Sequence, residues 1–228
     1  MKLTSKIFMA VALAFLSLGI CTAAENEKKP LEEKTLCVFG DSYVRNHRCP
    51  PSETWHAKAA EILGMKYENF GRNGSSVLYD RTKDGFGPAM TERYKDLPEN
   101  IDCLLIIAGH NDADLTKTDE DVEQFKGALS SLIDSLKEKY PDAKIGYVLP
   151  WSVDRGNFSK VIAAINSVCS EKGVPVFNAE EAGGIKVNDL EFRKKYFQGG
   201  GEKDTAHLND AGHNLIVASG AEFIKSLF

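Results

Sequence analysis

The chain has 228 residues, of which 27% are charged and 43% hydrophobic, and its formal net charge at pH 7 is −5. This length fits one domain with a sizeable core, and the acidic balance argues against a nucleic-acid partner. Beyond the first two dozen residues, no segment is long and apolar enough to suggest a membrane span.

The first 24 residues have the layout of a secretory signal peptide. Lys2 and Lys6 supply positive charge, an apolar run spans residues 7–20, and small residues then precede a polar stretch. The apolar run is shorter than the roughly 20 residues that a membrane anchor needs. The pattern therefore predicts an exported protein.

Two routes of processing fit this leader. Simple cleavage near Ala24 is favoured, but the residues before Cys21 also resemble a bacterial lipoprotein signal, in which Cys21 would be lipidated. We expect a polar linker at residues 25–34 and a single domain at 35–228. The location would be periplasmic, extracellular or lipid-anchored at the cell surface.

Apolar strand-like runs alternate with helical patterns along this domain. The expected strands are residues 35–39, 65–70, 103–108, 144–149 and 174–177. The expected helices are residues 52–63 with Ser52 as the N-cap, 119–140, 157–172 and 209–228. This alternation predicts an α/β fold, a three-layer α/β/α, flavodoxin-like sandwich with a five-stranded parallel sheet. Ligands bind beyond the carboxyl ends of the strands in such sheets.

Four cysteines follow the predicted leader, and the sequence leaves their pairing open. An exported protein can form disulfides, yet Cys37 and Cys103 lie in apolar strand-like runs, where cysteine often behaves as a small buried hydrophobe. No close C-x-x-C pair is present, so a zinc site is not expected.

Polar motifs follow the first three expected strands. The tripeptide Gly-Asp-Ser ends at Ser42, where a strand-to-helix turn could expose the hydroxyl group. A glycine-containing segment at residues 69–75 follows the second strand, and either glycine could let a backbone N–H approach a ligand. Asn111 follows the third strand and offers amide donors for a negative oxygen. Each motif alone is also ordinary turn composition.

A fourth motif precedes the last expected helix. Asp204 and His207 are three residues apart, so the carboxylate can meet one ring nitrogen and leave the other free to take a proton. The simpler interpretation is a solvated aspartate beside a capping histidine.

Taken together and in this order, the four motifs resemble those of the SGNH (GDSL-type) hydrolase family, whose blocks carry Ser, Gly, Asn and His. The resemblance implies that Ser42 is the nucleophile, His207 the general base and then acid, and Asp204 the residue that orients His207. It also implies an oxyanion hole formed by the amides of Ser42 and Gly74 and by the Asn111 side chain. Gly74 is preferred to Gly71 because the family's glycine lies five residues beyond an asparagine, as Gly74 lies beyond Asn69.

The chain departs from the usual family pattern at two places. Tyr43 follows the serine where a smaller aliphatic residue is common, and Ser75-Ser76 follows Gly74 where an aspartate is frequent. Both departures affect the expected shape of the pocket and leave the proton-transfer residues in place.

The expected reaction is hydrolysis of small acyl esters, acetyl above all, on carbohydrates, with no cofactor or metal. Tyr43 and Trp151 are candidates for stacking on a sugar ring, and His110 is a candidate for the pocket border; aromatic residues are equally common in cores. The alternatives are a lipid esterase, lysophospholipase or thioesterase of the same family, and a non-catalytic glycan-binding module on this fold.

His47, His56 and His213 rank below His207 as bases, because neither His47 nor His56 has an aspartate at the matching offset and His213 falls inside the last helix.

Overall fold

The computed structural model describes residues 29–153 and 156–228. The predicted signal peptide, with Cys21, and the first residues of the predicted linker lie outside this part of the chain. The described remainder of the linker packs against the domain, because the amide of Leu31 donates a hydrogen bond to the carbonyl oxygen of Leu63 at 2.9 Å.

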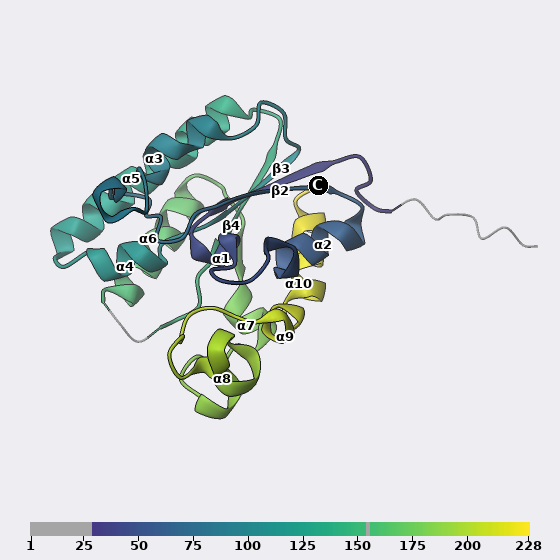
Figure 1. Cartoon of the computed structure of the whole chain (residues 1–228). Helices are drawn as coiled ribbons and strands as arrows, with labels where there is room; N and C mark the ends of the chain where they lie inside the picture. Colours follow the sequence, from purple (N-terminus) through teal and green to yellow (C-terminus); the bar gives the residue numbers. More distant parts are fainter. Residues whose placement is uncertain (1–28, 154–155) are drawn as a thin grey trace, which may run out of the picture.

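A five-stranded parallel sheet forms the centre of the molecule, with the strand order β2-β1-β3-β4-β5 (Figure 1). The strands are β1 (Thr35–Gly40), β2 (Lys66–Gly71), β3 (Cys103–Ile107), β4 (Lys144–Leu149) and β5 (Val176–Asn178). The predicted α/β fold and parallel five-stranded sheet are therefore confirmed. The chain adds β2 on one side of β1 and then crosses to add β3 on the other side, so the topological switch point lies between β1 and β3. Sheets of this kind bind ligands at the switch point.

The register of the strands brings three chain segments to one level. Gly40 at the end of β1 pairs with Gly71 at the end of β2 and with Ile107 at the end of β3. The segments that follow these strands therefore start side by side. The three central strands are buried along almost their whole length, which explains why their sequences are continuous apolar runs.

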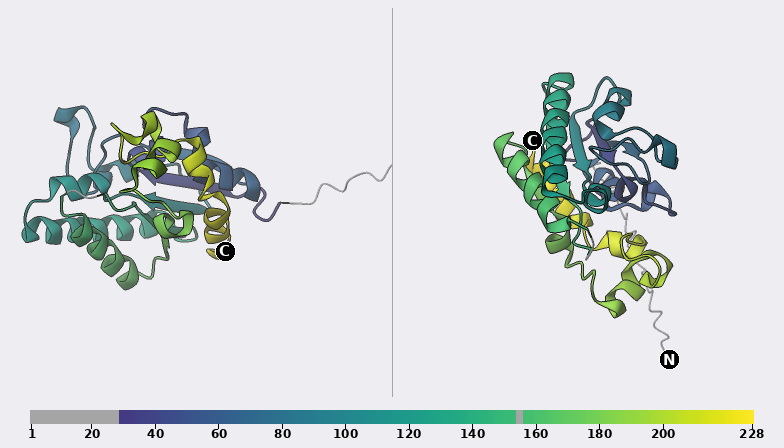
Figure 2. Two further views of the ribbon diagram at one scale, coloured as in Figure 1. Left: turned by 90° about the horizontal axis from the view of Figure 1, so that it is seen from below. Right: turned by 90° about the vertical axis from the view of Figure 1, so that its left-hand side faces the viewer.

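Helices cover both faces of the sheet. Helices α2 (Trp55–Leu63) and α10 (Val217–Ser226) lie side by side on one face, while α3 (Met90–Arg93), α5 (Asp119–Lys139) and α6 (Phe158–Glu171) cover the other (Figures 1 and 2). The α2–α10 contact is close, because a Cβ atom at Gly220 would lie 2.4 Å from the Trp55 ring.

The helix starts follow local capping chemistry. Helix α5 has a capping box in which the Thr118 and Asp121 side chains each accept a hydrogen bond from the other's backbone. The predicted cap of α2 is wrong: Ser52 lies within a 3-10 turn (η1, Pro51–Glu53), and Thr54 caps the helix by accepting from the amide of Ala57. The threonine hydroxyl lies three residues before that amide, which is the spacing that a cap requires.

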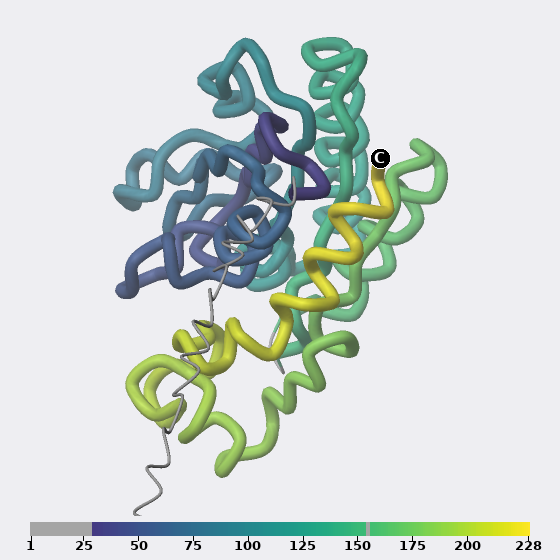
Figure 3. The backbone as a smooth tube through the Cα atoms, turned by 90° about the vertical axis from the view of Figure 1, so that its right-hand side faces the viewer, coloured from purple at the N-terminus to yellow at the C-terminus, as the bar shows by residue number. Residues whose placement is uncertain are grey.

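The predicted C-terminal helix is divided into α9 (Asp210–Asn214) and α10. Ile216 lies at the break, is fully buried, and packs so tightly on Gly183 that a Cβ atom there would be 2.6 Å from its Cγ1. The break therefore lies at a residue whose side chain is packed into the core. From this point α10 runs back along the molecule to the C terminus (Figure 3).

Several short elements were not predicted from the sequence. They are the helices α1 (Ser42–Arg45), α3, α4 (His110–Leu115), α7 (Ala179–Gly183) and α8 (Leu190–Tyr196), and the 3-10 turns η2 (Thr82–Asp84), η3 (Tyr94–Asp96) and η4 (Gln198–Gly201). Helices α1 and α4 directly follow β1 and β3. Helix α8 and turn η4 form a lobe that projects at one end of the molecule (Figures 1 and 3).

The four cysteines in the described residues are free thiols, and Cys37, Cys103 and Cys169 are buried. Burial raises the pKa of each of these three thiols to about 12, so they remain protonated. No helix in the described residues has the length and hydropathy needed to cross a membrane.

Candidate active site

Ser42 is the first residue of α1, directly beyond the end of β1. The carboxylate of Asp41 caps this helix by accepting a hydrogen bond from the amide of Tyr43 at 2.9 Å. Gly40 is required before them, because a Cβ atom there would lie 2.0 Å from the carbonyl oxygen of Ile107 on β3. Close packing of β1 against β3 therefore fixes where the turn starts and where the Ser42 hydroxyl lies.

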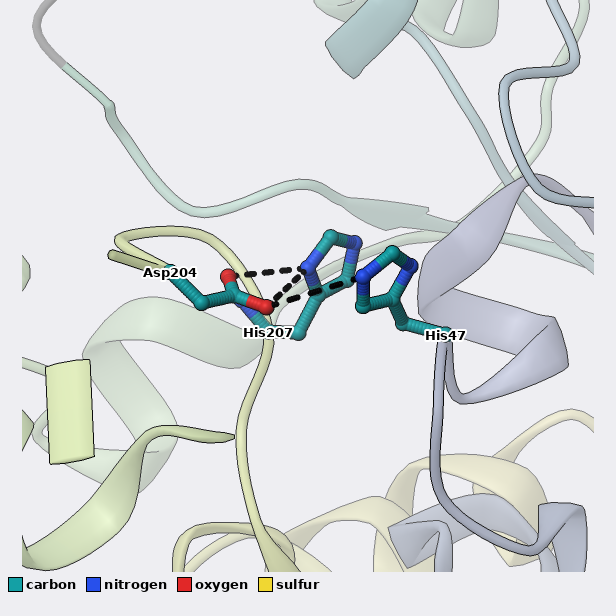
Figure 4. Close-up of side chains that lie close together, drawn as sticks. All are labelled: His47, Asp204 and His207. Carbon is teal, nitrogen blue, oxygen red and sulfur yellow. Dashed lines mark hydrogen bonds and ion pairs between the residues drawn. The ribbon is translucent and has the colours of Figure 1, made fainter. Parts of the chain in front are cut away.

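The structure brings Ser42, His207 and Asp204 into one hydrogen-bonded chain. The Nε2 atom of His207 is 2.8 Å from the Oγ atom of Ser42, although 165 residues separate them in sequence. The other ring nitrogen, Nδ1, is 2.9 Å from both carboxylate oxygens of Asp204 (Figure 4). This geometry favours the tautomer with a proton on Nδ1, which leaves Nε2 to accept the hydroxyl proton.

Asp204 is held in its ionised form. Burial acts to raise the pKa of this carboxyl, but the hydrogen bond and positive charge of His207 and the amides of Ala206 and His207 outweigh it and lower the pKa to about 2. Both amides donate to Oδ1, at 3.1 and 2.9 Å. The carboxylate is therefore charged and oriented at neutral pH.

Neighbouring elements fix the loop that carries His207. The amide of Gln198 donates to the carbonyl oxygen of His207 at 2.8 Å, and Phe197 forms an isolated antiparallel bridge with Leu208. On the opposite side, Nε1 of Trp151, just beyond β4, donates to the carbonyl oxygen of Ala206 at 2.6 Å. The histidine is thus positioned by backbone contacts from both the α8 lobe and the sheet.

The two candidate glycines after β2 have different surroundings. A Cβ atom at Gly71 would lie 2.2 Å from the amide nitrogen of Arg45, so Gly71 allows β2 to pack on α1. Gly74 has a φ of 72°, a left-handed conformation that favours glycine, and a Cβ atom there would lie 2.2 Å from the Phe86 ring. The packing role of Gly71 leaves Gly74 as the better candidate for an oxyanion amide.

Asn111 lies in the first turn of α4, beyond β3. Its Nδ2 atom donates to the carbonyl oxygen of Ser75 at 2.9 Å, which orients the amide and ties α4 to the loop after β2. The second N–H of the same nitrogen is then available for another acceptor.

Asp112 organises the loop after β2, a role that the sequence did not predict. Its buried carboxylate accepts hydrogen bonds from the Ser76 hydroxyl at 2.6 Å and from the amides of Val77 and Leu78 at 3.1 Å each. Ser75 and Ser76, which stand where the family often has an aspartate, are both anchored by α4. The only sequence signal for Asp112 is its place next to Asn111.

Arg93 of α3 is a second such residue. Its buried guanidinium donates to the Ser75 hydroxyl at 2.6 Å and to the carbonyl oxygen of Phe70 at 3.0 Å. Burial lowers the pKa of Arg93 to about 10, and burial also raises the pKa of Asp41 to about 7. No spacing in the sequence connects this arginine with the loop, because α3 reaches the site only through the tertiary fold.

The three predicted substrate-binding residues lie beneath the triad. Tyr43, His110 and Trp151 are each no more than 3% exposed. The Tyr43 ring centroid is 4.1 Å from that of Trp151, and the Tyr43 hydroxyl is 2.8 Å from Nδ1 of His110. Their burial favours a supporting role over the predicted one of offering an aromatic face to a sugar.

The other histidines separate into two groups. His56 and His213 are buried and bond to groups outside the triad: Nδ1 of His56 lies 2.9 Å from the Tyr67 hydroxyl, and Nε2 of His213 lies 3.1 Å from Oδ1 of Asn46. His47 instead lies at the site, stacked on His207.

His47, Asp204 and His207 offer potential metal-binding atoms within 4.8 Å of one another. The planes of the two imidazole rings differ by only 10°, so their in-plane lone pairs point alongside one another and do not converge on a point. Nδ1 of His207 is also engaged by Asp204. The arrangement suits a hydrogen-bonded triad with a stacked neighbour better than a tetrahedral metal site.

Comparisons with known proteins agree with this arrangement. The sequence model of the GDSL-like Lipase/Acylhydrolase family matches residues 38–215. No protein with a curated description matches the chain in sequence.

Solved structures share the fold at low sequence identity. A protein from Lactobacillus plantarum is 24% identical, with a TM-score of 0.69 over 86% of this chain and 99% of that one. The inhibitor-bound aryl esterase of M. smegmatis is 17% identical, with a TM-score of 0.67 over 86% and 100% of the two chains. A carbohydrate esterase family 2 enzyme with a carbohydrate binding domain, from Corynascus thermopiles (Myceliophthora fergusii), is 17% identical, with a TM-score of 0.63 over 87% and 67%.

The family match extends over most of the described domain and includes all four motifs. The chain therefore belongs to the GDSL-like lipase/acylhydrolase family. It is a serine hydrolase that acts on ester bonds.

Proposed function

We propose that this enzyme hydrolyses short acyl esters, acetyl esters above all, on carbohydrates, with Ser42 as nucleophile. The observation that carries the proposal is the hydrogen-bonded chain from Ser42 Oγ through His207 to Asp204, with distances of 2.8 and 2.9 Å. A serine, its base and the carboxylate that orients the base are the groups that acyl transfer through a covalent intermediate needs.

In the first half-reaction, Oγ of Ser42 attacks the ester carbonyl carbon while Nε2 of His207 takes the hydroxyl proton. Asp204 stabilises the imidazolium that forms, because its carboxylate already accepts from Nδ1. The tetrahedral intermediate then collapses, and Nε2 returns the proton to the departing alcohol oxygen. The acyl group is left on Ser42.

The negative oxygen of this intermediate would be held by three N–H donors: the amides of Ser42 and Gly74 and Nδ2 of Asn111. Within the described residues, neither of the two amides donates a hydrogen bond to another group. Nδ2 of Asn111 uses one of its two hydrogens for Ser75 and keeps the other. Donors fixed before the reaction stabilise a developing charge without reorganisation.

In the second half-reaction, water attacks the acyl-enzyme. Nε2 of His207 takes a proton from this water and returns it to Oγ of Ser42 as the ester bond breaks. The free acid leaves, and the serine hydroxyl is regenerated. The reactants consumed over the two half-reactions are the ester and one water molecule.

Packing around the nucleophile supports a short acyl group. Tyr43 and Trp151, with His110 behind them, fill the volume beneath Ser42, so a long chain has no room in that direction. The structural likeness to a carbohydrate esterase supports the glycan part of the proposal. The buried aromatic rings do not add to it.

A second candidate is hydrolysis of longer acyl esters. A cavity of about 500 Å³ beyond β4 is lined in part by Val153, Phe158 and Ile162. It neighbours the site, because the Phe158 ring centroid is 6.1 Å from that of His110. Ser152, Ser159 and Asn188 also line it, so the cavity has mixed polarity, and its apolar side could accept a hydrocarbon chain.

The covalent mechanism can be tested with a fluorophosphonate probe, which should label the wild-type enzyme at Ser42 and abolish hydrolysis of p-nitrophenyl acetate. The Ser42→Ala variant should neither be labelled nor turn over substrate, whereas Ser131→Ala, on the exposed face of α5, should behave as wild type. Full activity in Ser42→Ala, or labelling elsewhere, would contradict the proposal.

The acyl preference can be tested with p-nitrophenyl acetate, butyrate and octanoate, followed by acetylated polysaccharides. The short-acyl proposal expects kcat/KM to fall with chain length and acetate to be released from the polysaccharides. A strong preference for octanoate would favour the second candidate.

We also propose that the enzyme is exported, on the basis of the leader sequence described above. Expression of the full chain followed by cell fractionation should recover the processed protein outside the cytoplasm. Mass spectrometry of its first residue would distinguish cleavage near Ala24 from lipidation at Cys21.

A further inference from the structure

His47 lies directly against the proposed catalytic base. Its imidazole ring stacks on that of His207, with ring centroids 4.2 Å apart and planes within 10° of parallel (Figure 4). Its Nε2 atom is 3.9 Å from Oδ2 of Asp204. The exposed fractions of the side chains are 25% for His47, 15% for His207 and 10% for Asp204, so His47 is the outermost of the three.

The backbone holds His47 in this place through an uncommon conformation. Asn46 and His47 have φ values of 65° and 45°, in the left-handed region that asparagine and histidine adopt more often than most residues other than glycine. Gln198 and His213 both bond to the side-chain oxygen of Asn46, and Gln198 also bonds to its carbonyl oxygen. Nδ2 of Asn73 donates to the carbonyl oxygen of His47. Left-handed backbone that is fixed by so many contacts is often found at functional positions.

We propose that His47 is a positioning residue for His207: its uncharged ring holds the imidazole of His207 between Ser42 and Asp204, and protonation of His47 opposes catalysis. The inference rests on the proposed function, because it assigns His47 a role only if His207 is the base.

The positioning part follows from geometry. The His207 ring is fixed at its two nitrogens by Ser42 and Asp204, and a parallel neighbour 4.2 Å away blocks rotation of the ring out of that plane. The same ring lies between solvent and the Asp204–His207 pair. Less water at this pair strengthens the interaction between the carboxylate and the imidazolium that forms during turnover.

The charge part follows from the mechanism. His207 becomes a cation in the transition state, and a second cation stacked on it would be unfavourable. The titratable and charged groups that face His47 are His207 and Asp204 across the stack and Arg48 beside it in the chain, while the loop after β2 contributes the uncharged amide of Asn73.

Burial, then the charge of His207, lowers the pKa of His47; Asp204 opposes this effect and Arg48 adds to it. His47 is therefore neutral at neutral pH, which is the state that supports His207. Its protonation as the pH falls gives the site a second acid-sensitive group.

Two substitutions separate the effect of the His47 ring on activity from the effect of its protonation. His47→Asn removes the ring but suits the left-handed backbone, since asparagine is enriched there. His47→Phe keeps a flat face and cannot be protonated, and the contacts of Asn46 and Asn73 must hold it in a backbone conformation that phenylalanine disfavours. We expect kcat for p-nitrophenyl acetate at pH 8 to fall about three- to tenfold in His47→Asn with little change in KM, and to stay near wild type in His47→Phe. Arg48→Ala is the control, because it removes a neighbouring exposed charge and leaves the stack intact.

The pH dependence supplies a readout that a merely structural role would not move. As the pH falls, kcat/KM of the wild type should decline more steeply than that of His47→Phe, because protonation of His47 adds a second loss that the variant cannot show. Arg48→Ala should keep the steeper profile of the wild type. Circular dichroism at each pH would ensure that only folded protein is compared.

The inference fails if His47→Asn keeps wild-type kcat and both His47 variants keep the wild-type pH profile, while Ser42→Ala and His207→Ala are inactive. If Ser42→Ala or His207→Ala retains activity, the proposed function fails instead. The two results are therefore distinguishable.

Discussion

The guanidinium of Arg81 donates a hydrogen bond to the carbonyl oxygen of Gly74 at 2.9 Å and lies 4.3 Å from the centroid of the Phe86 ring. The Phe86 ring in turn occupies the space where a side chain at Gly74 would be. Arg81 thus holds the carbonyl side of Gly74 and Phe86 packs over its Cα, so the two residues together position the residue whose own N–H is proposed to face the oxyanion.

Loss of this anchor should lower turnover without removing any proposed catalytic group. We expect Arg81→Ala to reduce kcat for p-nitrophenyl acetate by about tenfold to a hundredfold, because small misplacements of a fixed donor are costly. Lys83→Ala, a change to an exposed residue of the same loop, is the control. Equal kcat values in the two variants would show that Arg81 does not position Gly74.

Removal of the Asn111 amide should have a larger effect. Asn111→Ala is expected to reduce kcat by about 100- to 1000-fold, the usual result of losing one oxyanion donor. The rate of fluorophosphonate labelling at Ser42 should fall with it, since that reaction also builds negative charge on an oxygen. Wild-type kcat in a folded Asn111→Ala variant would eliminate this residue from the oxyanion hole.

Much of the fold could be predicted because the central strands are buried on both faces, so their sequences are unmistakable apolar runs. The expected strand at residues 144–149 has the bounds that the structure shows, and α5 ends one residue before its prediction, near Pro141. Edge strand β5 is shorter and shifted, because partial burial leaves a weaker pattern. The break at Ile216 could not be foreseen, since it depends on contact with Gly183.

The site likewise contains residues that the sequence predicts and residues that only tertiary contacts reveal. Ser42, Asn111, Asp204 and His207 were recognisable because their order along the chain matches a known set of motifs. Asp112 and Arg93 were missed because they act on the loop through tertiary contacts that no spacing records. The sequence places His47 below His207 as a candidate base because no aspartate lies at the matching offset, yet the fold brings Asp204 close to it.

Asp112 should contribute to stability as well as to loop geometry. Asp112→Asn replaces one carboxylate oxygen with an NH2 group. This group must face either the amide of Val77 or the amide of Leu78 with the Ser76 hydroxyl, so at least one buried hydrogen bond is lost. We expect the free energy of unfolding, measured in urea, to fall by about 1–3 kcal/mol. Asp142→Asn, on an exposed turn, is the matched control, and the same loss in both variants would contradict the role given to Asp112.

Stability should also decline in mild acid because two buried histidines resist protonation. Burial lowers the pKa of His56 to about 3 and holds that of His213 well below its ordinary value. In the unfolded chain both rings titrate near pH 6.5, so below that pH the unfolded state binds more protons and is favoured. The free energy of unfolding should therefore fall as the pH drops from 6.5 towards 3, by up to about 1.4 kcal/mol per pH unit for each histidine.

Urea unfolding at pH 7 and pH 5 measures this dependence, and a His56→Gln variant isolates one of the two contributions. The substitution removes a titrating ring, so the variant should lose less stability between the two pH values than the wild type, whatever its stability at pH 7. His47→Phe is a useful comparison, because the His47 ring is a quarter exposed and its lowered pKa should give a smaller effect. If His56→Gln lost as much stability as the wild type over this range, the neutral state of the buried His56 ring would not be what makes the fold sensitive to acid.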